Sequence, residues 1–199
     1  MKISWGSADA EIKKDGFVKG LFLGLIVLTV NIGSFYYIMS MAKQSPVLIL
    51  LGTYALTILL PLVVITLFVL NARGKNGGYF TFKQAVTSVF IMTLTSYGIL
   101  LIGRDALFVK LVEPNMAAKI SKVMSDSRIV KEKAEGLNAD QINKDIIEKK
   151  QNYDLQGENN SLLIIENIPE NILMLFVLAI LFAAVFKKER PFLAEKAVG

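Results

Sequence analysis

The chain contains four long apolar blocks, separated by two short polar segments and one long one. The blocks cover residues 17–42, 47–70, 82–104 and 168–187, and the second block contains no charged residue. An α-helix rises about 1.5 Å per residue, so roughly 20 residues cross a hydrocarbon core of about 30 Å. The pattern therefore predicts an all-α protein, built as a four-helix transmembrane bundle.

The long segment between the third and fourth blocks is too long for a structureless loop in a compact protein. Apolar residues recur at helical spacing after Pro114, and Gly136 is suited to end that helix. Asn138 and Gln141 then fit the start of a second helix. We expect an extracytoplasmic helical hairpin over residues 114–154, in which the apolar stripes of the two helices face each other. It would dock a partner, lie on the outer leaflet, or cap the bundle by internal packing, and the sequence leaves these alternatives open.

Composition supports a membrane protein and removes several kinds of chemistry. The 199 residues are 53% hydrophobic with a mean hydropathy of +0.50, which is too apolar for a typical soluble domain. There is no histidine and no cysteine, so disulfides, thiol catalysis, zinc sites and imidazole acid–base chemistry are excluded. No metal, cofactor or catalytic residue is predicted, and the expected function is not enzymatic.

The net charge of +5 comes from basic residues that flank the apolar blocks. This distribution is typical of membrane proteins and disfavours nucleic-acid binding. One side of the bundle has only Lys43 in its short loop. The other side has Lys2, Lys13, Lys14, Lys19, Arg73, Lys75, Lys83, Lys187, Lys188, Arg190 and Lys196. The positive-inside rule therefore predicts that both termini are cytoplasmic. The first block exceeds the length of a signal-peptide core, so we interpret it as a retained anchor.

The turn "RGKNGGYFTF" (residues 73–82) has a lysine and two glycines, as phosphate-binding loops do. Such a loop requires a Lys-Ser or Lys-Thr pair after its glycines, between a buried strand and a helix. Here Lys75 precedes Gly77 and Gly78, and an apolar helical block comes before the turn. We interpret the glycines as the turn itself. Arg73 and Lys75 would then meet anionic headgroups, and Tyr79, Phe80 and Phe82 would anchor the chain at the membrane interface.

Small and polar residues within the blocks are candidates for helix packing. Gly20 and Gly24 have GxxxG spacing, Asn31 extends the stripe, and Pro61 is expected to kink the second helix. The alternative is a polar path for a substrate, but acidic and basic residues are absent from the predicted mid-membrane positions. Arg104 and Asp105 are expected as a surface-facing pair at the outer interface. The packing or interface candidates are Gly20, Gly24, Asn31, Gly77, Gly78, Tyr79, Arg104 and Asp105.

Three stretches, "NGGYFTFKQA", "LVEP" and "AEGLNADQINKDI", together resemble the bacterial membrane proteins grouped as domain-of-unknown-function family 4199. The matching positions are Gly77, Gly78, Tyr79, Glu113, Pro114, Gly136 and Gln141. The resemblance covers nearly the whole chain, and the glycine turn followed by the Glu-Pro step is its most specific part. It implies four helices in a bacterial inner membrane and no stated activity. Arg104 and Asp105 have no place in the family's pattern.

Three functions stay open at this point. The leading hypothesis is a non-enzymatic accessory or scaffold protein that binds a protein partner, a lipid or a second copy of itself. The second is a small oligomeric transporter or channel, in which Asn31 or Arg104 would be needed for flux. The third is a lipid-modifying enzyme at the outer leaflet using carboxylates, for which the candidates are Asp105, Glu113, Glu166 and Glu170.

Overall fold

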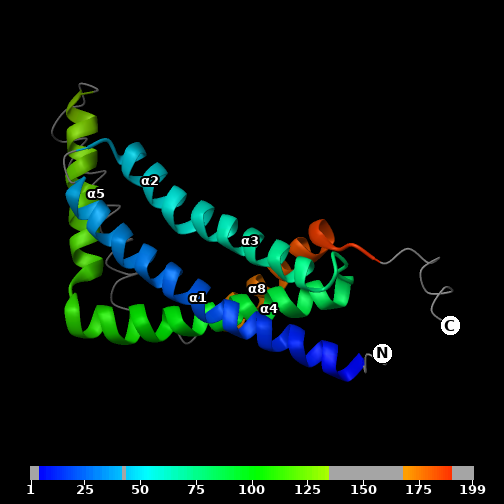
Figure 1. Cartoon of the computed structure of the whole chain (residues 1–199). Coiled ribbons are helices and arrows are strands. Elements are labelled where there is room, and N and C mark those ends of the chain that lie inside the picture. The colour runs from blue at the N-terminus through cyan, green and yellow to red at the C-terminus, as the bar shows by residue number, and fades with distance from the viewer. Residues whose placement is uncertain (1–4, 42–43, 135–167, 190–199) are drawn as a thin grey trace, which may run out of the picture. The chain divides into compact units, whose positions relative to one another are not determined.

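The computed structural model describes residues 5–41, 44–134 and 168–189. Its α-helices are α1 (Trp5–Ser40), α2 (Pro46–Tyr54), α3 (Leu60–Lys75), α4 (Phe82–Leu100), α5 (Met116–Ala134) and α8 (Ile168–Phe186) (Figure 1). Two π-helical segments, η1 (Ala55–Leu59) and η2 (Leu101–Val112), continue α2 into α3 and extend α4. Within the described residues there is no strand, so the all-α prediction is confirmed.

Four helical stretches are long and apolar enough to cross a membrane: Asp9–Ser40, Pro46–Lys75, Phe82–Val112 and Ile168–Phe186. They correspond to the four predicted blocks, which confirms four helices of membrane-spanning length. The helices extend beyond the apolar blocks. The first begins before residue 17, and the third continues past residue 104 because η2 adds a further helical segment. The predicted hairpin is described only in its first arm, α5, because its second arm lies outside the described residues.

The chain divides into two compact units. Unit 1 comprises Met1–Ile26, Pro61–Leu100 and Pro169–Gly199, and unit 2 comprises Val27–Leu60 and Leu101–Ile168. Two of the boundaries coincide with the π-helical segments, since η1 ends just before Pro61 and η2 starts directly after Leu100. Each unit has its own packing, and we describe them separately.

Unit 1 is built on close contact between α1 and α4. Gly16, Gly20 and Gly24 lie one turn apart on α1, and a methyl group at any of them would come within 3 Å of α4 atoms. The absence of side chains lets the two helices approach closely, as in small-residue packing of membrane helices. The predicted GxxxG pair therefore packs within the chain, and Gly16 extends it by one turn. Buried residues of the other helices complete this core: Ile65, Val69 and Ala72 on α3, and Ala179 and Ala183 on α8.

The π-helical turn η1 ends at Leu59, two residues before Pro61. Proline has no backbone N–H and its ring clashes with the carbonyl four residues earlier. At this place the Leu60 N–H bonds to the Ala55 carbonyl, five residues back, in place of the usual α-helical partner. The sequence predicts a kink at Pro61, and the structure has a π-helical turn, which is wider than an α-helical one, just before this residue.

In unit 2, α5 packs across the ends of α1 and α2 (Figure 1). Val123 and Met124 of α5 form a buried cluster with Ile38 of α1 and Ile49 of α2, with Ile120 packed against it. We expected this apolar stripe to face the second arm of the hairpin. Part of the stripe covers the helix ends instead, which supports the capping alternative for this arm, because these side chains are already buried within the chain.

Candidate functional site

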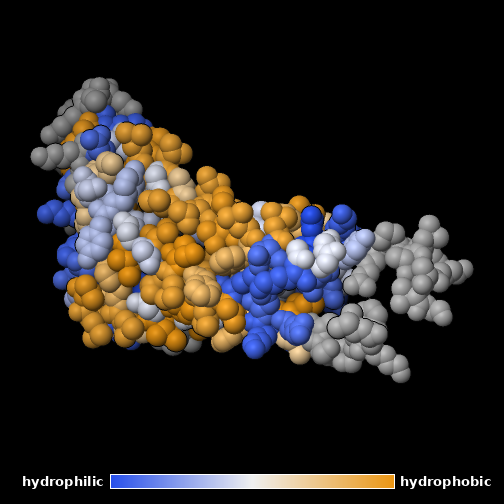
Figure 2. Space-filling model, viewed as in Figure 1, coloured by the Kyte–Doolittle hydropathy of each residue, from blue (hydrophilic) through white to orange (hydrophobic). Residues whose placement is uncertain are grey.

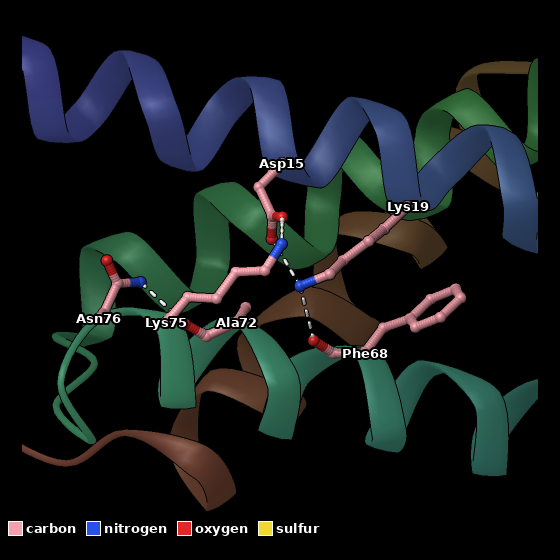
Figure 3. A network of polar contacts seen from close by, with 6 residues as sticks. All are labelled: Asp15, Lys19, Phe68, Ala72, Lys75 and Asn76. Atoms are coloured by element: carbon pink, nitrogen blue, oxygen red, sulfur yellow. Dashed lines mark hydrogen bonds and ion pairs between the residues drawn. The ribbon is translucent and has the colours of Figure 1, made fainter.

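One polar cluster of unit 1 is centred on Asp15 of α1 (Figure 3). Its carboxylate accepts bonds from two lysines: Lys19 Nζ lies 2.5 Å from Oδ2, and Lys75 Nζ lies 2.7 Å from Oδ1. Lys19 Nζ also donates to the backbone carbonyl of Phe68 on α3, at 3.1 Å. One carboxylate thus joins α1 to the C-terminal end of α3, and the cluster has an excess of one positive charge.

Lys19 is buried, with its side chain only 9% exposed. An ammonium in such a place requires both a counter-charge and hydrogen-bond acceptors, which Asp15 and the Phe68 carbonyl supply. The sequence alone places Lys19 only among the basic residues flanking the first block. The signal that could have identified the pair is the acid four residues before the lysine, on the same helical face. The carbonyl partner on α3 has no sequence signature.

A cavity of about 380 Å³ opens beside this cluster, between α1, α3 and the start of α4. Its charged lining consists of Glu11, Lys14, Asp15 and Lys75, and Val18 and Phe80 are among the apolar residues that complete it. Glu11 and Lys14 are exposed side chains on α1. Hydrophilic residues gather over this N-terminal part of α1 in Figure 2.

The glycine turn lies directly after α3. Gly77 and Gly78 have positive φ values of 70° and 84°, and the Gly78 N–H bonds to the Arg73 carbonyl at 3.0 Å, which ends the helix. A helix precedes the turn, as expected, so this is not the strand-to-helix context of a phosphate loop. Tyr79 is half-buried. Both positions therefore favour glycine because of the backbone conformation of the turn.

The predicted aromatic anchor at this turn is partly wrong. Phe80 is fully buried, and its backbone pairs with Lys188 after α8 through two hydrogen bonds of 2.8 Å. It therefore belongs to the core of unit 1 and does not face a membrane interface. Phe82, which is 40% exposed, retains an outward position. Sequence could not separate the two, because both are aromatic residues beside the same turn.

Unit 2 contains a second polar cluster, formed by Asn31, Arg104 and Asp105. Arg104 Nε donates to Asp105 Oδ1 at 2.6 Å, and Arg104 Nη1 lies 3.5 Å from Asn31 Oδ1. The amide nitrogen of Asn31 donates to the Val27 carbonyl at 2.9 Å. One turn further along the same helices, the rings of Phe35 and Phe108 pack edge to face at 5.9 Å. The two residues proposed as transport candidates are thus neighbours.

The Arg104–Asp105 pair is less exposed than a surface-facing pair would be, and its place at the outer interface stays a prediction. The Asp105 side chain is 11% exposed and that of Arg104 is 35% exposed. The pair lies within the π-helical segment η2, which continues to Val112, and the C-terminal half of α1 packs beside it. The apolar block in the sequence ends near residue 104, but the helix does not, and this is why the pair appeared to be at an end.

The other candidates lie as follows. Glu113 is paired with Lys119 at 2.5 Å, Glu170 is in the first turn of α8, and Glu166 lies outside the described residues. No group of three or more His, Cys, Asp or Glu side chains able to hold a metal occurs in the described ranges.

The sequence pattern of one protein family, described as "Protein of unknown function (DUF4199)", matches residues 19–188. The chain belongs to this family. The resemblance based on the glycine turn and the Glu-Pro step is therefore confirmed. In this DUF4199 chain Gly77, Gly78 and Tyr79 form the turn after α3, and Glu113 directly follows η2. Gly136 and Gln141 lie outside the described residues. Searches of curated proteins and of solved structures found no match.

Proposed function

We propose that this protein is a non-enzymatic accessory or scaffold protein of the bacterial inner membrane that binds a protein or lipid partner. In this proposal four helices cross the membrane, and both termini and the glycine turn face the cytoplasm. The four apolar helices of membrane-spanning length support a membrane location. The orientation rests on the basic residues near the ends of the helices.

The observation that carries a partner-binding role is the apolar surface of α8. Only 11% of its most apolar stretch is buried within the chain, against 33% for the α4–η2 stretch. Leu173, Val177, Leu181 and Val185 recur every four residues along α8, and each is at least 43% exposed. Residues at this spacing form one face of a helix. This face offers a continuous contact surface to another transmembrane helix.

The stretch formed by α2, η1 and α3 offers a second apolar surface, also 11% buried. Apolar residues cover most of the visible surface of α2 in Figure 2. In a bilayer such surfaces contact lipid unless a helix of another protein or a second copy covers them. Close packing then supplies the association energy, since lipid tails and apolar side chains are equally hydrophobic.

Site-directed crosslinking tests the proposed partner on α8. Because the chain has no native cysteine, a photoactivatable maleimide attached to Leu181→Cys in native membranes reports on that face alone. We expect a discrete protein adduct, or a product of twice the chain's mass if the partner is a second copy. Lys13→Cys, an exposed position of α1, is the control. The same products from both positions, or lipid adducts alone at Leu181→Cys, would contradict a protein partner on α8.

Membrane-impermeant maleimide applied to intact spheroplasts tests the orientation. We expect Lys13→Cys and Glu189→Cys to react only after the membrane is permeabilised, because both exposed residues lie near the proposed cytoplasmic ends. Labelling of either position in intact spheroplasts would reverse the assignment.

A second candidate function, an oligomeric transporter or channel, is favoured by the proximity of Asn31 and Arg104. The guanidinium forms an ion pair with Asp105, lies 3.5 Å from the Asn31 amide oxygen, and belongs to a helix of membrane-spanning length. Charged groups in such helices often line substrate pathways. In proteoliposomes, Arg104→Met and Asn31→Leu should each abolish flux of an anionic solute, while Arg73→Met should leave it intact. Equal flux through all variants, or none through the unmodified protein across a broad solute panel, would count against transport.

A further inference from the structure

The charges around the unit 1 cavity are not matched one to one. Asp15 is shared by Lys19 and Lys75, which leaves one positive charge in excess at that end of the cavity. Glu11 and Lys14 line the same cavity, and neither is within ion-pair distance of an opposite charge in the described part of the chain. The cavity lining therefore includes two ammonium groups that can bind an anion, those of Lys14 and Lys75, and one carboxylate that can bind a cation, that of Glu11.

The cavity also adjoins apolar surface. Val18 lines the cavity and is 41% exposed, and Phe22, one turn further along α1, is 60% exposed. Phe22 lies on the same face of α1 as Asp15 and Val18, which line the cavity, because the three residues are three to four positions apart. These residues belong to a helical stretch of membrane-spanning length. A polar cavity at the end of an exposed apolar surface fits an amphiphile whose headgroup enters the cavity and whose acyl chains follow the helices.

We propose that this cavity binds a zwitterionic phospholipid whose headgroup carries a phosphodiester and a primary ammonium, as in phosphatidylethanolamine. The phosphodiester binds the ammonium groups of Lys14 and Lys75, and the lipid ammonium binds the carboxylate of Glu11. The lysines suit a phosphate because each presents a localised positive charge with three N–H donors. The inference rests on the proposed membrane location and on no protein partner.

The carboxylate of Glu11 determines the selectivity. A purely anionic lipid, such as phosphatidylglycerol, would match the lysines but leave Glu11 without a counter-charge. Phosphatidylcholine carries the same net charge as phosphatidylethanolamine, but its quaternary ammonium has no N–H to donate to Glu11. A preference for the primary amine over both lipids is therefore the signature of this arrangement, and phosphate binding alone would not produce it.

Native mass spectrometry of the full-length protein tests the proposal. The protein is equilibrated with equal amounts of the three lipids, all with identical acyl chains, and the abundance of each lipid adduct is measured. We expect phosphatidylethanolamine adducts to exceed each of the others by about two- to fivefold, the ratio expected from one partly exposed ion pair.

Two double variants with the same charge changes separate the cavity from general surface charge. Glu11→Gln/Lys14→Met should bind the three lipids equally. Asp9→Asn/Lys13→Met, which changes two exposed α1 residues outside the cavity lining, should keep the preference. None of the four side chains takes part in the Asp15 network, so both double variants leave its ion pairs in place.

Equal adducts of the three lipids on the unmodified protein, or loss of selectivity in both double variants, would overturn the inference. Neither result bears on the proposed protein partner, because that proposal is tested by crosslinks from Leu181→Cys, which report on α8 alone. Conversely, the protein could show the lipid preference and give no crosslink from Leu181→Cys. That result would support the lipid site and contradict the protein partner on α8.

Discussion

A single methyl group added at Gly20 tests the close contact between α1 and α4. A Cβ at this position would lie 2.7 Å from the Met92 carbonyl oxygen and 2.7 Å from the Thr95 Cβ, with the Met92 Cα at 3.1 Å. The first and third of these atoms belong to the backbone of α4. The clash therefore cannot be relieved by rotating a side chain, and the two helices must move apart.

Gly33 provides a matched control on the same helix. A Cβ there would have no atom within 4 Å outside its own helix, so Gly33→Ala adds a methyl group without a clash. Replacing glycine by alanine in a helix stabilises it by about 1 kcal/mol in both variants, because alanine has less backbone freedom to lose. Overpacking at Gly20 costs about 1–3 kcal/mol. The helix-propensity gain cancels in the comparison, so Gly20→Ala should be less stable than Gly33→Ala by about 1–3 kcal/mol.

The assay is thermal unfolding of both variants in the same mild detergent at one scan rate. For a chain of this size 1 kcal/mol corresponds to a change in Tm of about 2–4 °C, so Gly20→Ala should melt about 2–12 °C below Gly33→Ala. Gly24→Ala should behave like Gly20→Ala, since its Cβ would lie 2.6 Å from Ile99 Cδ1 and 3.1 Å from the Ser96 Cα. Equal Tm values for Gly20→Ala and Gly33→Ala would refute the α1–α4 packing described above.

Three further predictions use the same melting assay. Asp15→Asn leaves the buried ammonium of Lys19 without a counter-charge, so it should lower the free energy of unfolding by about 3 kcal/mol or more. Asp15→Asn/Lys19→Met should recover stability, because it removes the unpaired charge. A double variant as unstable as the single one would contradict the ion pair. Gly77→Val should cost about 1–2 kcal/mol of stability, because the backbone φ at this position is +70°, in the left-handed region. Gly77→Asn should cost less, because asparagine adopts this region more readily. Equal Tm values for the two variants would argue against a left-handed conformation at Gly77. Met124→Ala should cost about 2–5 kcal/mol of stability, because Met124 is buried against α1 and α2. The control Val130→Ala, at a half-exposed position of the same helix, should cost under about 0.5 kcal/mol. Similar losses in the two variants would contradict the contact of α5 with the ends of α1 and α2.

Sequence reasoning identified the helices more reliably than the contacts between them. The four apolar blocks became four helical stretches of membrane-spanning length, and Gly77 and Gly78 became a turn with positive φ at both positions. These features depend on short stretches of chain: the length of an apolar run, or a backbone conformation that glycine adopts without strain. The second arm of the hairpin and the membrane orientation remain predictions.

The candidate polar sites were harder to predict. Asn31 and Arg104 were singled out separately, but nothing in the sequence indicated that they would lie 3.5 Å apart. Lys19 was counted as a flanking basic residue, although it is buried against a carbonyl of α3. The π-helical segment η2 moved Arg104 and Asp105 away from the predicted helix end, and its sequence contains no proline to signal a change of helical geometry.

The sequence by itself determined that this protein has four apolar helices, a glycine turn and no histidine or cysteine chemistry, because these follow from composition and local conformation. Tertiary structure decided which helix Gly16, Gly20 and Gly24 contact, which carbonyl Lys19 reaches, and that α5 covers the ends of α1 and α2. The physical reason is that apolar residues surround membrane-type helices on all sides. Hydrophobic periodicity therefore does not mark an inward face, and small residues and paired polar groups select the contacts only once the helices meet.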